Sequence, residues 1–223
     1  MTPGLPPPAT EIAGRALLED WSAGTAISRA HPHTFGSVQL DKRPNANFRF
    51  STIHQGRRVV PVAYGGENDH AAASETIFHT IETPTGAVRP RRVYLAKYLT
   101  WQWSSIHPTR DLHLVRLDDA GLTALGTTRT DLIETTRLAY PTTRAWAEAI
   151  AAALPTVDGL WWYSRQDPTR KALVLFGQLP DRPGGVARAD LTSNEPALPF
   201  ALPQGLDRLD QIADDFDVEV TRP

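Results

Sequence analysis

Several segments of the chain carry apolar residues at the three- and four-residue spacing of a helix that buries one face. This spacing predicts helices over Thr10–Trp21, over about 69–81 and over Thr143–Leu154, with a short helix near Leu206–Asp214. Gly24 ends the first helix, and Pro155 stops the third. Asn68 or Asp69 can cap the second with a side-chain oxygen.

Other segments have the short apolar runs of buried strands, bounded by Gly, Pro and Asp. We expect strands over Val59–Tyr64, Arg92–Leu99, Asp111–Leu117, Gly159–Ser164, Ala172–Phe176 and Val218–Thr221. Pro61 interrupts the first strand, which we therefore place near a sheet edge. Residues 25–57 are rich in His, Pro, Gly and Asn and predict loops around short strands, for example near Phe48–Ser51.

The predicted helices and strands are mixed without a regular βαβ rhythm, which favours an α+β fold, a twisted mixed β-sheet flanked by helices. The Pro-rich lead and first helix occupy residues 1–24, a central domain spans 25–180, and a C-terminal extension at 181–223 packs on the same domain. No internal repeat or long linker divides the chain. We therefore expect one domain.

Composition removes several classes of function. The 223 residues include no cysteine, which excludes disulfides, thiolate zinc sites and a cysteine nucleophile. A net charge of −2 argues against a nucleic-acid partner. No apolar run is long enough to span a bilayer, and Met1–Pro8 lacks the basic and apolar parts of a secretory signal. We expect a cytoplasmic protein that contacts no membrane.

Polar residues stand out in three places where apolar ones are expected. Glu75 shares a helix face with small and aromatic residues, so it either lines a cavity or lies at the helix edge, which is the commoner placement of a carboxylate. Ser164 follows a buried strand, where a serine often just begins a turn, and no Gly-x-Ser-x-Gly elbow surrounds it. Arg29 and Arg49 are either surface charges or guanidinium forks for a phosphate.

Two weaker signals do not support a site. His31 and His33 are spaced for one strand face, but no third ligand lies nearby, so we expect no metal. Gly65-Gly66 falls between a predicted strand and helix but lacks the fingerprint of known phosphate-binding loops.

Taken together, the order of these segments along the chain and their amino-acid sequences resemble the RES domain family. The most specific part is Val60–Glu67 followed by Ala72–His79, which is similar to the family's strand ending in Tyr and helix carrying its Glu. Asn47–Ser51 and Ser28–His31 resemble the family's two Arg elements, and Asp158–Arg165 resembles the segment with its Ser. The resemblance covers roughly residues 25–180, and it implies that these residues form a RES catalytic domain.

The resemblance implies a fold like that of mono-ADP-ribosyltransferases and an enzyme that acts on NAD⁺. Such a protein is the toxin of a bacterial toxin–antitoxin pair, and its partner is an antitoxin with an Xre-like helix-turn-helix. The implied reaction cleaves the nicotinamide–ribose bond with phosphate or water as the acceptor. A protein acceptor and a binding module without turnover remain as alternatives.

The resemblance also implies a role for each candidate residue. Glu75 would stabilise the positive charge that develops on the ribose, and Arg29 and Arg49 would hold phosphate groups. Tyr64 would stack on or hydrogen-bond the nicotinamide–ribose end, and Ser164 would orient nicotinamide or phosphate. NAD⁺ is then the substrate, and no metal is needed because nicotinamide leaves as a neutral group.

Overall fold

The computed structural model describes residues 4, 6–7, 9–44, 46–79 and 91–222. The helices are α1 (Ala9–Arg15), α2 (Asp69–Thr76), α3 (Asp119–Leu125), α4 (Arg129–Leu132), α5 (Tyr140–Ala153) and α6 (Pro203–Asp215). Short 3-10 helices are η1 (Leu95–Lys97), η2 (Arg137–Ala139) and η3 (Arg188–Asp190). The strands are β1 (Leu18–Trp21), β2 (Ile27–Pro32), β3 (Ile53–Gln55), β4 (Arg58–Val60), β5 (Val62–Gly66), β6 (Arg91–Tyr94), β7 (Trp101–Pro108), β8 (Leu112–Arg116), β9 (Gly159–Tyr163), β10 (Lys171–Phe176), β11 (Leu191–Thr192), β12 (Leu198–Pro199) and β13 (Val218–Thr221).

A curled mixed sheet forms the centre of the molecule. Its strands follow the order β1-β8-β9-β10-β5-β2-β7-β11, and β12 also pairs with β7. The β8–β9 ladder is parallel, whereas the other ladders of this sheet are antiparallel. β13 and β6 form a separate parallel pair, and β3 and β4 form a hairpin. The expected α+β fold with a twisted mixed sheet is confirmed.

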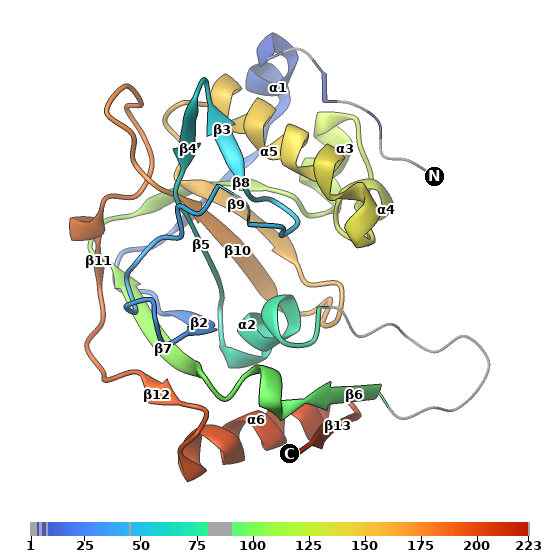
Figure 1. The fold of residues 1–223 in the computed structure, drawn as a ribbon. Helices are drawn as coiled ribbons and strands as arrows, with labels where there is room; N and C mark the ends of the chain where they lie inside the picture. Colours follow the sequence, from blue (N-terminus) through green and yellow to red (C-terminus); the bar gives the residue numbers. More distant parts are fainter. Residues whose placement is uncertain (1–3, 5, 8, 45, 80–90, 223) are drawn as a thin grey trace.

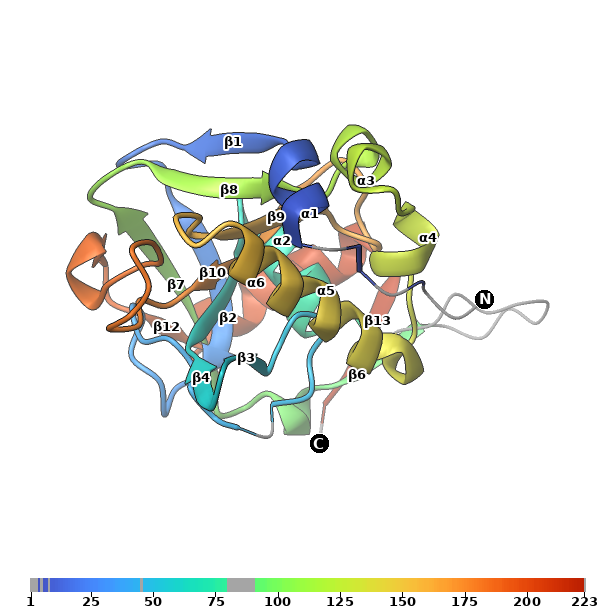
Figure 2. The same cartoon turned by 90° about the horizontal axis from the view of Figure 1, so that it is seen from above.

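The helices divide into two groups around this sheet (Figures 1 and 2). α1, α3, α4 and α5 lie together on one side, and α2 and α6 lie by the β2–β7 end of the sheet. The alternation of side chains along β10 explains why both of its faces are covered. Val174 and Phe176 join the core beneath α5, whereas Leu173 and Leu175 join the core on the opposite face.

A third apolar cluster attaches the C-terminal segment. Leu209 and Ile212 of α6 pack with Phe78 and Trp103, and all of these side chains are buried. Trp103 also donates a hydrogen bond from its indole nitrogen to the carbonyl of Gly205, at 3.3 Å. The segment after residue 180 therefore closes over the β2–β7 end of the sheet, where α2 lies.

Several elements appear where the sequence predicts them. The helix over Thr143–Leu154 is confirmed as α5, and the strands over Asp111–Leu117, Gly159–Ser164, Ala172–Phe176 and Val218–Thr221 are confirmed as β8, β9, β10 and β13. The short helix near Leu206–Asp214 is confirmed as α6, which begins slightly earlier.

Other predictions need correction. The helix expected over Thr10–Trp21 ends at Arg15, because Leu18–Trp21 pairs with β8 and buries Trp21. The edge position predicted for the strand over Val59–Tyr64 is wrong, because β5 lies between β10 and β2 and Pro61 comes just before its first residue. The segment Arg92–Leu99 is only partly strand, because η1 follows β6.

Three further corrections concern β7, the end of α2 and the turn before β3. The sequence analysis assigned no element to Trp101–Pro108, which forms the eight-residue strand β7. α2 ends at Thr76, several residues before the expected end, and Ile81 lies outside the described residues. Phe48–Ser51 is closed by a single bridge between its end residues and forms a turn instead of a strand.

Candidate functional site

The packing of α2 against the sheet fixes the position of Glu75. Asn68 caps the helix by accepting a hydrogen bond from the backbone N–H of Ala71, at 3.0 Å. A Cβ added to Gly66 would lie 2.4 Å from the Cβ of Ala71, and one added to Gly65 would lie 2.5 Å from Ile27 Cγ2. The two glycines and the alanines of α2 therefore allow a close approach of helix and strands that larger side chains would prevent.

Glu75 lines a small cavity that four aromatic rings help to enclose, together with charged residues that include Arg29, Asp41 and Arg43. Phe35, Phe48, Tyr64 and Trp101 contribute rings to it. The cavity volume is about 70 Å³, which is room for a few water molecules or part of a planar ring. We call it the aromatic cavity. A dinucleotide would have to extend beyond it.

Arg29 also lines the aromatic cavity, but its guanidinium already has partners. Nε donates to the carbonyl of Tyr64 at 3.2 Å, and Nη1 donates to the carbonyls of Ser37 and of Gln39, the latter at 3.2 Å. Burial lowers the pKa of Arg29 to about 10, an effect that Asp41 partly offsets. Arg29 therefore joins β2 to β5 and to the 37–39 loop.

Tyr64 presents its ring to the aromatic cavity, while its hydroxyl is held on the side of the turn before β3. The hydroxyl accepts a hydrogen bond from the backbone N–H of Phe50 at 3.0 Å and lies 3.3 Å from Ser51 Oγ. Burial raises the pKa of the phenol well above its ordinary value. Tyr64 is thus a neutral, fixed wall, with the Phe48 ring centroid 5.7 Å away.

His31, a further lining residue, is buried and neutral. Nδ1 lies 3.1 Å from the carbonyl of Pro32, and Nε2 lies 2.8 Å from Ser104 Oγ. Because a carbonyl can only accept, Nδ1 carries the proton and Nε2 accepts from the serine. Burial, together with the charge of Arg29, lowers the pKa of His31 to about 4.

Arg49 lies outside the aromatic cavity, buried against the segment after α4. Its Nη1 donates to the carbonyls of Leu132 and Ile133 and to Thr135 Oγ1, with distances of 3.1 Å to Leu132 and to Thr135. Its Nε is buried without a partner among the described residues. Arg49 therefore orders the 132–135 segment.

Ser164 is fully buried and does not line the aromatic cavity. Its Oγ accepts from the backbone N–H of Gln166 at 3.2 Å, and its carbonyl accepts from the Arg129 guanidinium at 3.0 Å. These contacts close the turn after β9. The structure thus brings Arg29, Tyr64 and Glu75 to one cavity and leaves Arg49 and Ser164 outside its lining.

A second cavity, of about 540 Å³, lies at the C-terminal end of α2. Its basic lining residues are His79, Lys97, Arg137 and Arg165, and we call it the basic cavity. Burial lowers the pKa of His79, whereas the charge of Glu75 raises it and the charges of Arg137 and Arg49 lower it. Glu75 and His79, four residues apart at this end of α2, line one cavity each.

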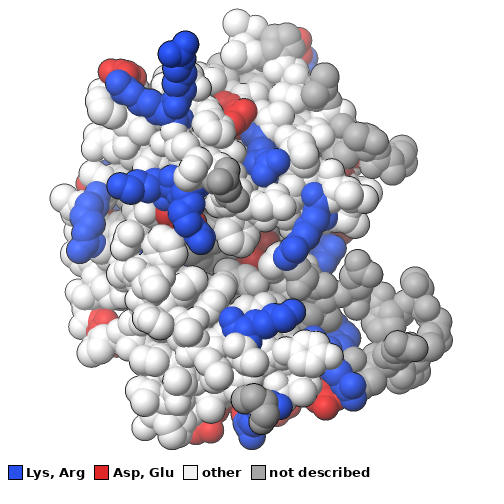
Figure 3. Space-filling model, viewed as in Figure 1, with Lys and Arg blue, Asp and Glu red and all other residues white. Residues whose placement is uncertain are grey.

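Figure 3 shows a face of the molecule that is hollowed near its middle, with several Lys and Arg side chains around the hollow. The sequence analysis missed Lys97, Arg137 and Arg165, which lie in three separate segments with no shared motif. Arg165 was quoted within the Ser164 segment, and only that adjacency could have drawn attention to it. Among the described residues, no cluster of His, Asp and Glu could hold a metal ion.

Comparison with known proteins gives one informative result. The family model described as the RES domain matches residues 8–201, which is most of the chain. No curated protein and no solved structure gives a significant match. Within the described residues, no helix has both the length and the apolar character needed to cross a membrane.

Proposed function

The chain belongs to the RES domain family, and on this premise we propose that it cleaves the nicotinamide–ribose bond of NAD⁺, with phosphate or water as the acceptor. The observation that carries the proposal is the placement of Glu75. This carboxylate lines an aromatic cavity beside a basic one. The pair of cavities suits a substrate with a flat ring at one end of the reacting bond and phosphates at the other.

Glu75 supplies the charge that the reaction requires. As the C–N bond breaks, its electron pair goes to the nicotinamide nitrogen, and positive charge develops on the ribose as in glycoside hydrolysis. A fixed carboxylate beside the ribose stabilises this charge more in the transition state than in the ground state. A C–O bond to phosphate or water then completes the transfer, and with water a proton is also released.

The aromatic cavity receives the nicotinamide ring in this proposal. Rings of Phe48, Tyr64 and Trp101 offer flat faces, and the positively charged nicotinamide of NAD⁺ is attracted to such faces. Since the Tyr64 hydroxyl is already bonded to the Phe50 backbone, stacking is the role of Tyr64 that the geometry supports.

The remaining candidates act as positioning residues. Arg29 holds β2 and the 37–39 loop, Arg49 holds the 132–135 segment, and Ser164 closes the turn that carries Arg165. β2 lines the aromatic cavity, and Thr135 and Arg165 line the basic cavity. The resemblance to mono-ADP-ribosyltransferases belongs to the same proposal, as does the biological role of a toxin that an Xre-like antitoxin neutralises.

Product analysis tests this function and identifies the acceptor. Purified protein is incubated with NAD⁺, with and without inorganic phosphate, and the products are separated by chromatography. Free nicotinamide supports bond cleavage. ADP-ribose-1″-phosphate formed only with phosphate identifies a phosphorylase, and plain ADP-ribose identifies a glycohydrolase. Intact NAD⁺ under both conditions contradicts the proposal and directs attention to a protein acceptor, which labelling of a lysate would reveal.

A further inference from the structure

The basic cavity gathers positive charge that the composition of the chain does not predict. Lys97, Arg137 and Arg165 line it together with His79, and no Asp or Glu is among its described lining residues. The whole chain has a net charge of −2. Three cations brought together without a lining carboxylate repel one another, and an anion bound between them would relieve this repulsion.

These cations are also available to a ligand, unlike most arginines of the protein. Arg110, Arg116 and Arg129 each pair with a carboxylate. Within the described part of the chain, the Arg137 side chain makes no hydrogen bond or ion pair, and the Lys97 ammonium has only the Tyr94 ring, 5.8 Å away.

Arg165 uses one guanidinium nitrogen for structure, and its other nitrogens have no partner among the described residues. Its Nη2 donates to the carbonyl of His79 at 2.8 Å. This bond ties the guanidinium to the end of α2.

Hydrogen bonds fix the segments that line the basic cavity. Next to Lys97, the hydroxyl of Tyr98 donates to the carbonyl of Ile77 at 3.3 Å, just beyond the end of α2. Near Arg137, Thr135 Oγ1 accepts from the buried Arg49. The segments that carry Lys97 and Arg165 are therefore tied to the residues just after α2, and the segment that carries Arg137 is tied to Arg49.

We propose that Lys97, Arg137 and Arg165 form an anion-binding subsite that takes a phosphate group next to Glu75. The inference rests on the proposed function and deepens it. Guanidinium forks match phosphate oxygens with paired hydrogen bonds, which a lone ammonium cannot do. The cavity, at about 540 Å³, is large enough for a pyrophosphate. The sequence analysis gave this role to Arg29 and Arg49, whose guanidinium groups are bonded to backbone carbonyls.

The phosphate has two chemical sources, the pyrophosphate of NAD⁺ and free inorganic phosphate as the acceptor. Calorimetric titration of the wild-type protein with ADP-ribose and, separately, with inorganic phosphate distinguishes them. We expect R137Q and K97Q each to weaken binding of at least one probe by about fivefold or more, because each removes a charge-assisted contact. Weakened ADP-ribose binding identifies the pyrophosphate, and weakened phosphate binding identifies the acceptor.

R188Q is the matched control, because Arg188 is exposed and lines neither cavity. Circular dichroism checks that each variant is folded. The proposal is overturned if both variants bind both probes as the control does, or if the wild type binds neither probe at millimolar concentration. The titrations need no turnover. Intact NAD⁺ with variant-sensitive binding would reject only the proposed function, and NAD⁺ cleavage with insensitive binding would reject only the subsite.

Discussion

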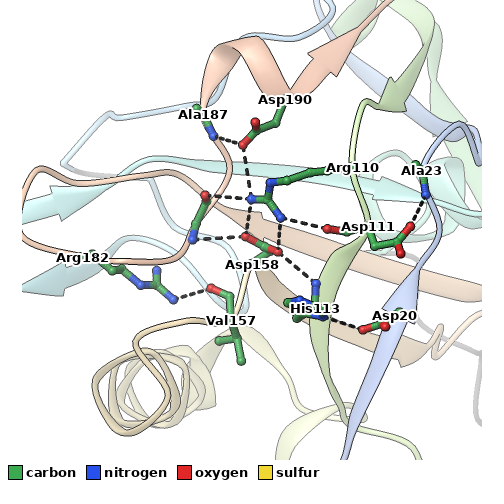
Figure 4. A network of polar contacts seen from close by, with 11 residues as sticks. Asp20, Ala23, Arg110, Asp111, His113, Val157, Asp158, Arg182, Ala187 and Asp190 are labelled. Carbon is green, nitrogen blue, oxygen red and sulfur yellow. Dashed lines mark hydrogen bonds and ion pairs between the residues drawn. The ribbon is translucent and has the colours of Figure 1, made fainter.

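Loss of the buried Asp158 carboxylate should damage the fold at a point outside the candidate site. Asp158 is 1% exposed, and both of its oxygens are used (Figure 4). Arg110 donates to both oxygens at 2.8 Å, His113 donates its backbone N–H at 2.9 Å, and Gly185 donates its backbone N–H at 3.2 Å. Arg110 also reaches Asp190 at 3.2 Å. The carboxylate therefore joins β8, β9 and the 182–190 segment.

The change Asp158→Asn removes the negative charge and replaces one acceptor with an NH₂ donor. The new donor would face either the N–H groups of Arg110 and His113 or those of Arg110 and Gly185, so two of the four hydrogen bonds are lost in either orientation. Removing one partner of a buried ion pair costs about 3–5 kcal/mol. Because the Arg110 side chain is 38% exposed and keeps contact with water, we expect the low end, about 3 kcal/mol.

Urea denaturation followed by tryptophan fluorescence measures this loss, since Trp161 and Trp162 are buried in the native core. The control is Asp111→Asn, in which the exposed carboxylate oxygen that accepts from the Ala23 N–H can be kept as an amide oxygen. We expect the control to lose less than about 1 kcal/mol. Equal stability of the two variants would refute the argument from burial and bonding.

Three further outcomes follow from the site. Gly66→Ala should displace α2 and reduce NAD⁺ cleavage, with a stability loss of about 1–3 kcal/mol. The control Gly14→Ala, which has nothing within 4 Å of the added Cβ, should leave activity unchanged, and a fully active Gly66→Ala enzyme would contradict the packing argument. Arg49→Ala should lower the free energy of unfolding by about 2–4 kcal/mol, because three acceptors lose a charged donor. Urea denaturation measures the loss, and a value below about 1 kcal/mol would contradict the structural role of Arg49. His31 should titrate in NMR spectra near pH 4. Its contribution to stability should fall as the pH drops from 6.5 to about 4, because between these values the unfolded chain binds a proton at His31 and the folded chain does not. Titration of His31 near pH 6.5 would contradict the buried neutral state.

The hydrophobic pattern predicted the elements whose signals are local. The fourteen-residue α5 has an apolar face and a following proline, and the β9–β10 pair has two apolar runs around a turn. These features do not depend on partners far away in the sequence. They were predictable from the chain alone.

The failures come from pairing between distant segments. Leu18–Trp21 has a helical spacing but becomes β1, because residues 112–115 offer a strand partner. β5 is central although Pro61 precedes it, because the proline lies before the first strand residue and its carbonyl accepts from Gly177 at 2.6 Å. Local spacing does not contain this information.

The candidate site shows the same division. The sequence identified Glu75, Tyr64 and Arg29, which the fold brings to one cavity. It could not show that the Arg49 guanidinium donates to the carbonyls of Leu132 and Ile133, or that Lys97, Arg137 and Arg165 line one cavity with His79. Such contacts join residues that lie far apart in the sequence.

The most direct test of the central claim compares the wild-type protein with Glu75→Gln. The substitution keeps the shape of the side chain and removes its charge. Both proteins are incubated with NAD⁺ and phosphate, released nicotinamide is measured by chromatography, and matching urea midpoints confirm that both are folded. We predict that the wild type releases nicotinamide and that Glu75→Gln releases none above the protein-free control. Nicotinamide release by Glu75→Gln at a rate near that of the wild type would contradict the assignment of Glu75 and the account built on it.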